Sequence, residues 1–338
     1  MQERLDWIDA VKGTCLILVV IAHLWRPCPQ WVHLLTGGYM QVFFIMAGLT
    51  SSVSAKTFRN QVAQKSIRLV LPYCFYGIIL LLLGAILPKH MDLGNGLLGL
   101  LYGRYTLFPP SIEPNISLLK ACGYLSPLWF LPCIYVSYIL LEWYDRARYP
   151  EMIVAMAVIV GIISPLFPIL MPWSIEMSCV GFLLMLLGRA LRPILLNSSE
   201  QGKHELLGQI VLVIGCMGIY IAAWLLDGPV NMSISQMGNT KIFFPLQVVF
   251  FCLLGGSEAI VLSILFKAIQ TSIITRSVAY IGRQALRLLC IHLFIGETVY
   301  YLFAGRDVPM VVTFACALAV ILIINYVLDR LPWKKVLG

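Results

Sequence analysis

The sequence places a lysine and a histidine eleven residues apart in an apolar segment, with an aspartate just before them. These residues are Asp9, Lys12 and His23. In an α-helix, eleven residues turn through about 1100°, close to three whole turns, so Lys12 and His23 share a face about 16 Å apart. Asp9 stands three residues before Lys12, where it can pair with the ammonium and orient it. Neutral imidazole can take a proton from a hydroxyl at physiological pH, which is the task of a general base in acyl transfer to an alcohol.

A second histidine lies in a late apolar segment, five residues before a glutamate. His292 and Glu297 would be about 140° apart around a helix, so we do not expect them to pair. An ionisable side chain at membrane depth is costly, which makes each one a functional candidate. We predict that His292 orients the acceptor or acts as a second acid or base, with a packing role as the alternative.

A glutamate in another apolar segment completes the predicted catalytic set, which is His23, Asp9, His292 and Glu258. Glu258 follows Gly255, Gly256 and Ser257, where we expect the helix to be loosened. Its carboxylate would then contact a substrate hydroxyl or Arg287. Glu176 stands near the predicted outer interface, and we interpret it as a solvated residue.

The elements that must position these residues are membrane helices. Hydrophobic residues make up 60% of the 338 residues and charged residues 12%, and the mean hydropathy is +0.87. This balance excludes a water-soluble domain. We therefore predict a single all-α domain over residues 1–338, with about ten helices long enough to cross a hydrocarbon core of roughly 30 Å. The predicted spans are 8–26, 38–55, 69–87, 127–143, 151–170, 174–190, 206–226, 243–266, 284–303 and 308–328.

The distribution of basic residues predicts the orientation of this bundle. With both termini in the cytoplasm, the cytoplasmic loops hold most of the 24 Lys and Arg residues, as the positive-inside rule requires. The exceptions are Arg26, Lys89, Arg104, Lys120, Lys241 and Arg306. The formal net charge of +8 is therefore a topology signal, although it would also attract lipid headgroups or a phosphorylated cofactor. It gives little reason to expect nucleic acid.

Other features of the chain complete this picture. The acidic residues before the first apolar segment argue against a cleaved signal peptide. The ten cysteines show no Cys-x-x-Cys pair and no Cys/His metal spacing, so we expect no metal site. Two longer loops on the predicted outer side, Pro88–Pro127 and Asp227–Lys241, are where an external acceptor would most plausibly be met. The first contains Leu93–Tyr102, an apolar piece too short to span. The sequence does not indicate an oligomeric state.

Several segments, in order along the chain, resemble one known family. The opening Arg4–His23 resembles the first helix of the membrane acyltransferase-3 family, and especially of its fucose 4-O-acetylase-like branch. That helix carries a basic residue, ten residues and then a histidine, and Lys12 to His23 fits this spacing. Later matches to family motifs are Val42–Leu49, Lys65–Tyr73, Leu128–Leu131 and Ile281-Gly282-Arg283 followed by His292. Ala47 and Ala285 depart from the pattern, because serine is common at both positions.

The resemblance implies transfer of an acyl group, usually acetyl, from cytoplasmic acyl-CoA to a hydroxyl of a sugar, surface polysaccharide or lipid-linked glycan. We expect such a protein in the inner or plasma membrane of a bacterium. Basic residues at the cytoplasmic mouth would hold the CoA phosphates while its arm carries the thioester towards His23. The predicted phosphate contacts are Lys12, Arg59, Lys65 and Arg68. A snorkelling lysine and the positive-inside rule are the alternative explanations for these charges. Trp129 would stack on the sugar or belong to an interfacial aromatic belt.

Two other classes of membrane protein are alternatives to an acyltransferase. Ten helices with buried acidic groups would also suit a transporter or flippase for a glycolipid or small metabolite. Transporters often show broken helices in two related halves, which the sequence does not reveal. A membrane sensor would be joined to a soluble effector domain, and we find none in the sequence.

Overall fold

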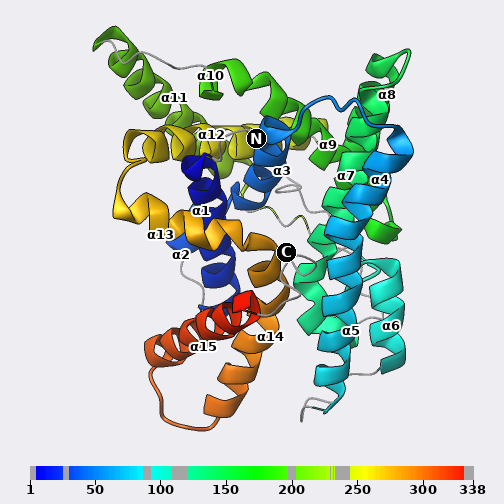
Figure 1. The fold of residues 1–338 in the computed structure, drawn as a ribbon, viewed down its shortest axis with the longest axis vertical. Coiled ribbons are helices and arrows are strands. Elements are labelled where there is room, and N and C mark those ends of the chain that lie inside the picture. The colour runs from blue at the N-terminus through cyan, green and yellow to red at the C-terminus, as the bar shows by residue number, and fades with distance from the viewer. Residues whose placement is uncertain are drawn as a thin grey trace.

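The structure is a computed structural model of an all-helical membrane protein. It describes residues 5–25, 30–86, 93–108, 120–196, 203–228, 230, 232 and 244–330. Within these ranges all regular elements are helical, which confirms the predicted fold class. In Figure 1, α4 to α8 lie on the right of the view and α11 to α13 on the left, with α3 between the two groups.

The first half of the chain contributes the helices up to the end of α7. They are α1 (Asp6–Leu24), α2 (Gln30–Leu35), α3 (Tyr39–Thr50), α4 (Phe58–Lys65), the π-helix η1 (Ser66–Val70), α5 (Leu71–Ile86), α6 (Leu93–Tyr102), the 3-10 helix η2 (Lys120–Trp129) and α7 (Phe130–Tyr144). Several run on into one another, so that α4, η1 and α5 form one continuous helical stretch, Phe58–Ile86. Leu93–Tyr102 is helical and, at 10 residues, short as predicted.

The second half begins with a short helix and ends with two long ones. Its elements are α8 (Pro150–Ile163), η3 (Ser164–Leu166), η4 (Pro172–Ser174), α9 (Ile175–Ala190), α10 (Arg192–Leu196), α11 (Lys203–Asp227), α12 (Phe244–Ala268), α13 (Ile273–Arg283), α14 (Ala285–Phe303) and α15 (Met310–Arg330). The predicted span 243–266 lies within the single helix α12 across its described part.

Nine described helical stretches are long and apolar enough to cross a membrane. They account for nine of the ten predicted spans. The tenth, 151–170, forms the 14-residue helix α8 followed by η3. A helix of this length rises only about 21 Å, which is shorter than a typical hydrocarbon core. After η3 the segment meets the chain beyond α6, where the Leu170 N–H donates to the Leu107 carbonyl over 2.8 Å.

The loops that were predicted to be cytoplasmic come together at one end of the bundle. The Arg189 guanidinium, at the end of α9, forms two hydrogen bonds of 2.5 and 2.7 Å with the Asp145 carboxylate after α7. Its Nε also donates to the Ser51 hydroxyl, at the end of α3, over 2.9 Å. Arg283 and Asp6 join α13 to the start of α1 through a 3.0 Å ion pair. This arrangement agrees with the predicted topology of the loops.

Glycines allow the central helices to approach each other closely. A Cβ added to Gly48 of α3 would lie 1.9 Å from the Met185 carbonyl oxygen of α9, and one added to Gly188 of α9 would lie 2.0 Å from the Ile45 carbonyl oxygen. Helix α13 crosses α1 in the same way (Figure 1), since a Cβ on Gly282 would lie 1.7 Å from the Asp9 carbonyl oxygen. Small residues at such crossings allow the van der Waals packing that drives helix association in lipid.

We predict that the Gly48→Ala substitution destabilises the bundle while the same change in α11 does not. The added methyl group would force α3 and α9 apart, at an expected cost of about 1–3 kcal/mol for overpacking. Gly215→Ala is the matched control, because no atom lies within 4 Å of the added Cβ there. Thermal unfolding in detergent should show a lower melting temperature for Gly48→Ala alone. Equal melting temperatures for the two variants would contradict the close packing described above.

Candidate active site

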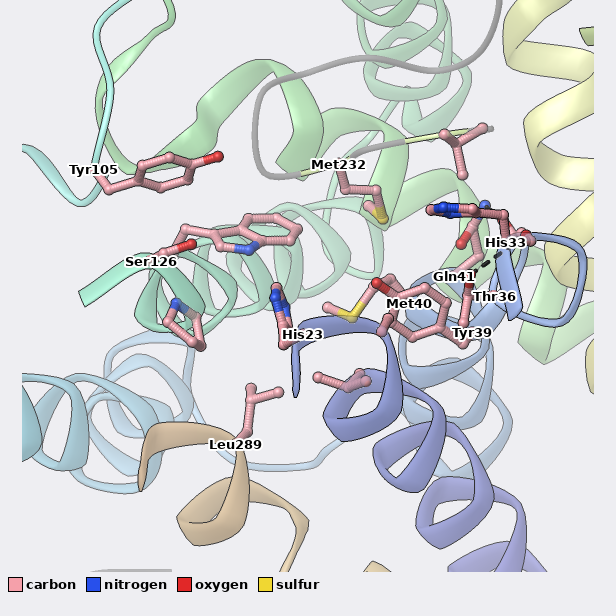
Figure 2. Close-up of a pocket in the computed structure, with 16 residues that line it drawn as sticks. His23, His33, Thr36, Tyr39, Met40, Gln41, Tyr105, Ser126, Met232 and Leu289 are labelled. Atoms are coloured by element: carbon pink, nitrogen blue, oxygen red, sulfur yellow. Dashed lines mark hydrogen bonds between the residues drawn. The ribbon is translucent and has the colours of Figure 1, made fainter. Parts of the chain in front are cut away.

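His23 lines a cavity of about 240 Å³ inside the bundle. Figure 2 shows its ring near the centre of the view, with Tyr105 and Ser126 on one side and Met40 and Tyr39 on the other. The cavity wall is formed by residues of α1, α2, α3, α14 and η2 and by residues that follow α2, α6 and α11. It combines aromatic side chains with a few polar groups, as small-molecule sites commonly do.

A second histidine lies directly behind His23. The ring centroids of His23 and His292 are 5.4 Å apart. His292 is fully buried and does not line the cavity, and its Nδ1 lies 3.2 and 2.9 Å from the Leu288 and Leu289 carbonyl oxygens. Because carbonyl oxygens only accept, Nδ1 carries the proton of the neutral ring and Nε2 keeps a lone pair. That Nε2 has no hydrogen-bond partner among the described residues.

Two further cavities extend from the His23 site towards the end of the bundle that holds the basic loops. A cavity of about 180 Å³ shares Leu289 with the His23 cavity and is lined mainly by apolar side chains. The next, of about 450 Å³, shares Lys12 and Thr50 with it and is also lined by Asp9. We name these the histidine, middle and cytoplasmic cavities, the last after the predicted side of the basic loops. The three cavities lie in this order along α1, with His23 at the first and Lys12 at the other two. Lys12 and His23 share a face of α1, as predicted.

The predicted phosphate contacts are not gathered in one place. Lys12 lines both the middle and the cytoplasmic cavities. The Lys65 ammonium lies 3.4 Å from the ring centroid of Tyr138, which lines the middle cavity. Arg59 and Arg68 are exposed on α4 and η1 and line none of the three cavities. Lys12 and Lys65 are therefore better placed for an anionic ligand in these cavities.

Trp129 forms part of the wall of the histidine cavity. Its side chain is only 6% exposed, so it does not belong to an interfacial aromatic belt. An indole in a cavity wall can stack on a sugar ring, and this role remains a prediction.

Glu258 lies apart from the three cavities. Its Oε2 would be 2.5 Å from a Cβ on Gly38 and has no hydrogen-bond partner within the described part of the chain. The predicted contact with Arg287 is wrong. The Arg287 guanidinium instead donates to the side chains of Asn325, Gln284 and Asp329 over 2.9, 2.7 and 3.2 Å.

The glycines before Glu258 do not loosen α12, so that prediction is also wrong. The helix is continuous from Phe244 to Ala268. A Cβ on Gly255 would lie 2.3 Å from the Cβ of Gln41, so this glycine lets α12 pack against α3. Gln41 itself is fully buried and lines the histidine cavity, and its Oε1 has no hydrogen-bond partner among the described residues.

A buried ion pair braces the far end of the site, and sequence reasoning missed it. The sequence predicts a solvated Glu176, but the Glu176 and Arg104 side chains are both fully buried and form an ion pair. The Arg104 Nε also donates to the Met171 carbonyl over 2.8 Å. This pair joins the segment after α6 to the start of α9. The next residue after Arg104 is Tyr105, which lines the histidine cavity, so the ion pair helps to hold that wall in place.

The backbone beside this ion pair is held in an unusual conformation. Trp173 and Ser174 have φ angles of 54° and 53°, in the left-handed region that residues with side chains rarely adopt. The Trp173 indole N–H donates to the Leu101 carbonyl over 3.0 Å, which ties this turn to α6. Gly103, with a φ of 75°, packs against this turn. A Cβ added to Gly103 would lie 3.0 Å from the Trp173 Cα. The turn is therefore over-determined by contacts from two segments.

The fold and the site together define a polytopic membrane protein with a histidine inside the helical bundle. A family model described as an acyltransferase domain, that of the acyltransferase 3 family, matches residues 5–330. The chain therefore belongs to the acyltransferase 3 family and is a membrane acyltransferase, as the sequence resemblance predicts. No curated protein and no solved structure matches it.

We predict that Glu176→Gln strongly destabilises the protein. Removing the carboxylate leaves the buried Arg104 charge without its counter-charge, which typically costs about 3–5 kcal/mol. Arg283→Gln is the control, because the Arg283–Asp6 pair is 33% and 45% exposed and should contribute less than about 1 kcal/mol. Thermal unfolding in detergent would measure both. A Glu176→Gln variant as stable as Arg283→Gln would show that the buried pair does not brace the fold.

Proposed function

We propose that this acyltransferase moves an acetyl group from cytoplasmic acetyl-CoA to a hydroxyl of a sugar in a surface polysaccharide or lipid-linked glycan. We place it in the cell membrane of a bacterium. One observation carries the proposal: three cavities that share lining residues lie in order from a basic end of the bundle to a histidine. Family membership supports acyl transfer, and the cavities supply a route for a long donor and a separate place for an acceptor.

The two cavities below His23 suit the shape and charge of an acyl-CoA. CoA is a polyanion at its nucleotide end and carries the thioester at the end of a long flexible arm. The cytoplasmic cavity offers Lys12 to the phosphates, and the middle cavity offers apolar walls, including Phe43 and Leu286, to the arm. The separation of about 16 Å along α1 between Lys12 and His23 is bridged by that arm.

The histidine cavity suits a sugar acceptor. Trp129, Tyr39 and Tyr105 present aromatic surface, which can stack on sugar rings, and Gln41 presents an amide oxygen with no partner among the described residues. The wall that contains Tyr105 belongs to the end of the bundle opposite the basic loops. This location favours an acceptor that enters from outside.

In the proposed reaction His23 is the general base. The acceptor hydroxyl gives its proton to an imidazole nitrogen of His23 while its oxygen attacks the thioester carbonyl. The tetrahedral intermediate then collapses, the carbon–sulfur bond breaks, and protonated His23 returns the proton to the departing thiolate. The products are the acetyl ester and CoA with a free thiol. A transient acetyl group on His23 is the alternative course, and a stable acetyl-histidine trapped without acceptor would favour it.

His292 acts through His23 in this scheme. It touches His23 but none of the three cavities, so we assign it a positioning role and not contact with substrate. Its Nδ1–H is tied to the α14 backbone, so its ring is fixed in place and limits the orientations that the His23 ring can adopt. Asp9 and Glu258 do not line the histidine cavity, and their predicted catalytic roles remain untested proposals.

We predict that His23→Ala abolishes O-acetylation of the cell-surface glycan without lowering the amount of protein in the membrane. The variant loses the base but keeps the cytoplasmic cavity, so it should still bind CoA. O-acetyl signals in glycan NMR, immunoblotting and CoA binding to purified protein are the three measurements.

Two results would overturn the proposed function. Normal O-acetyl content in the His23→Ala variant would exclude His23 as the base. Substrate counterflow by the purified wild-type protein, with no release of CoA from acetyl-CoA, would instead indicate a transporter.

We predict that His292→Phe lowers kcat by roughly 10²-fold, the lower end of a typical general acid–base contribution. The KM for acetyl-CoA should stay within about twofold, because His292 lies far from the phosphate end of the cavities. Steady-state kinetics of CoA release would separate the two constants. A rise in KM with unchanged kcat would contradict the positioning role and indicate that His292 supports donor binding.

A further inference from the structure

The cytoplasmic cavity has a second basic wall, opposite α1, that the sequence did not single out. Arg192, the first residue of α10, lines this cavity together with Lys12. Its Nε donates to the Leu49 carbonyl over 2.9 Å and its Nη2 to the Gly48 carbonyl over 3.2 Å. These carbonyls belong to the last turn of α3, the end of a helix that carries partial negative charge. The Gly48 carbonyl also accepts from the Ser51 N–H and hydroxyl, over 3.1 and 2.9 Å. Arg192 therefore covers an end of a helix that would otherwise repel an anion.

Among the described carboxylates, Asp145 offsets part of the Arg192 charge but is itself bonded to Arg189. Arg189 forms two hydrogen bonds with Asp145, but among the residues that the structure describes no carboxylate forms an ion pair with Arg192. Burial and the nearby Arg189 charge lower the pKa of Arg192, and Asp145 offsets only part of that effect. The Nη1 group also makes no hydrogen bond within this part of the chain and can donate to a ligand.

The size and position of the cavity agree with a nucleotide site. Its volume of about 450 Å³ lies in the range of small-molecule pockets, and it opens at the end of the bundle where the basic loops meet. Asp9 also lines it, on the α1 side. An anion would therefore lie nearer to Arg192, on the α3 and α10 side, and reach Lys12 across the cavity.

We propose that Arg192 binds a phosphate of the acyl donor and that the cytoplasmic cavity is the site for the nucleotide end of CoA. This inference rests on the proposed function for the identity of the donor. Arginine suits the task because its planar fork matches phosphate oxygens and its charge persists at every physiological pH. Arg192 thereby takes a role that the sequence analysis gave to Arg59 and Arg68.

The test compares Arg192→Gln with the wild type on three acetyl donors that differ in their phosphates. These are acetyl-CoA, acetyl-dephospho-CoA, which lacks the 3′-phosphate, and S-acetylpantetheine, which has none. For acetyl-CoA we expect Arg192→Gln to raise KM at least tenfold with kcat within about twofold, as loss of a charge-assisted hydrogen bond predicts. For S-acetylpantetheine the two proteins should have equal KM values. Acetyl-dephospho-CoA identifies the phosphate that Arg192 binds. If Arg192→Gln and the wild type have equal KM values for this donor, Arg192 binds the 3′-phosphate.

Controls separate this role from a structural one. Arg148→Gln removes the same charge from an exposed residue at the same end of the bundle and should behave as wild type. Arg192→Lys should restore part of the affinity. If Arg192→Gln weakens use of S-acetylpantetheine as much as acetyl-CoA, or leaves the KM for acetyl-CoA unchanged, the inference is wrong.

Binding of CoA itself distinguishes failure of this inference from failure of the proposed function. Isothermal titration of purified wild-type and Arg192→Gln proteins with CoA needs no acyl transfer. If the wild type binds CoA and the variant does not, while neither releases CoA from acetyl-CoA, the inference holds and the proposed reaction fails. If both bind CoA equally, the inference fails whatever the reaction.

Discussion

The close approach of helix backbones at glycines is the constraint on which the rest of this structure depends. Lipid tails are as apolar as the helices, so no hydrophobic force between helices compensates for poor packing. At Gly48 and Gly188 the backbones of α3 and α9 come so near that a single methyl group would collide with a carbonyl oxygen. At Gly282, α13 meets α1 in the same way beside Asp9. These contacts set the position of α1, and with it the walls of the three cavities.

The histidine pair follows from that packing and not from any local sequence. His23 and His292 lie on α1 and α14, which also meet where Gly296 approaches Leu24 and where the Tyr300 hydroxyl donates to the Leu24 carbonyl. This contact puts one ring on the cavity wall and the other behind it, out of reach of substrate. The difference in exposure divides the work between them: a base must reach the hydroxyl, whereas a buried neighbour can only orient that base.

The arginines at the two ends of the bundle are held in different ways. Arg104 and Glu176 neutralise each other at one end, beside a strained turn that holds the cavity wall. At the other end Arg192 is bonded to backbone carbonyls, which satisfies part of its guanidinium without cancelling its charge. The two charges of a buried ion pair largely cancel, so the pair holds two segments together and attracts few other ions. A cation that is only partly compensated still attracts anions. The two ends therefore differ in function although each contains an arginine bonded to the backbone, fully buried in Arg104 and partly exposed in Arg192.

The sequence alone determined the helical membrane class, nearly all the spans, the side on which basic loops gather and the shared face of Lys12 and His23. These properties depend on hydropathy, charge and the 3.6-residue period, which are local along the chain. Only the tertiary structure decided that His292 lies behind His23, that Glu176 pairs with Arg104, and that a cavity joins Arg192 to Lys12. Those contacts connect residues on helices far apart in sequence, and the packing that brings them together leaves no periodic signal along the chain.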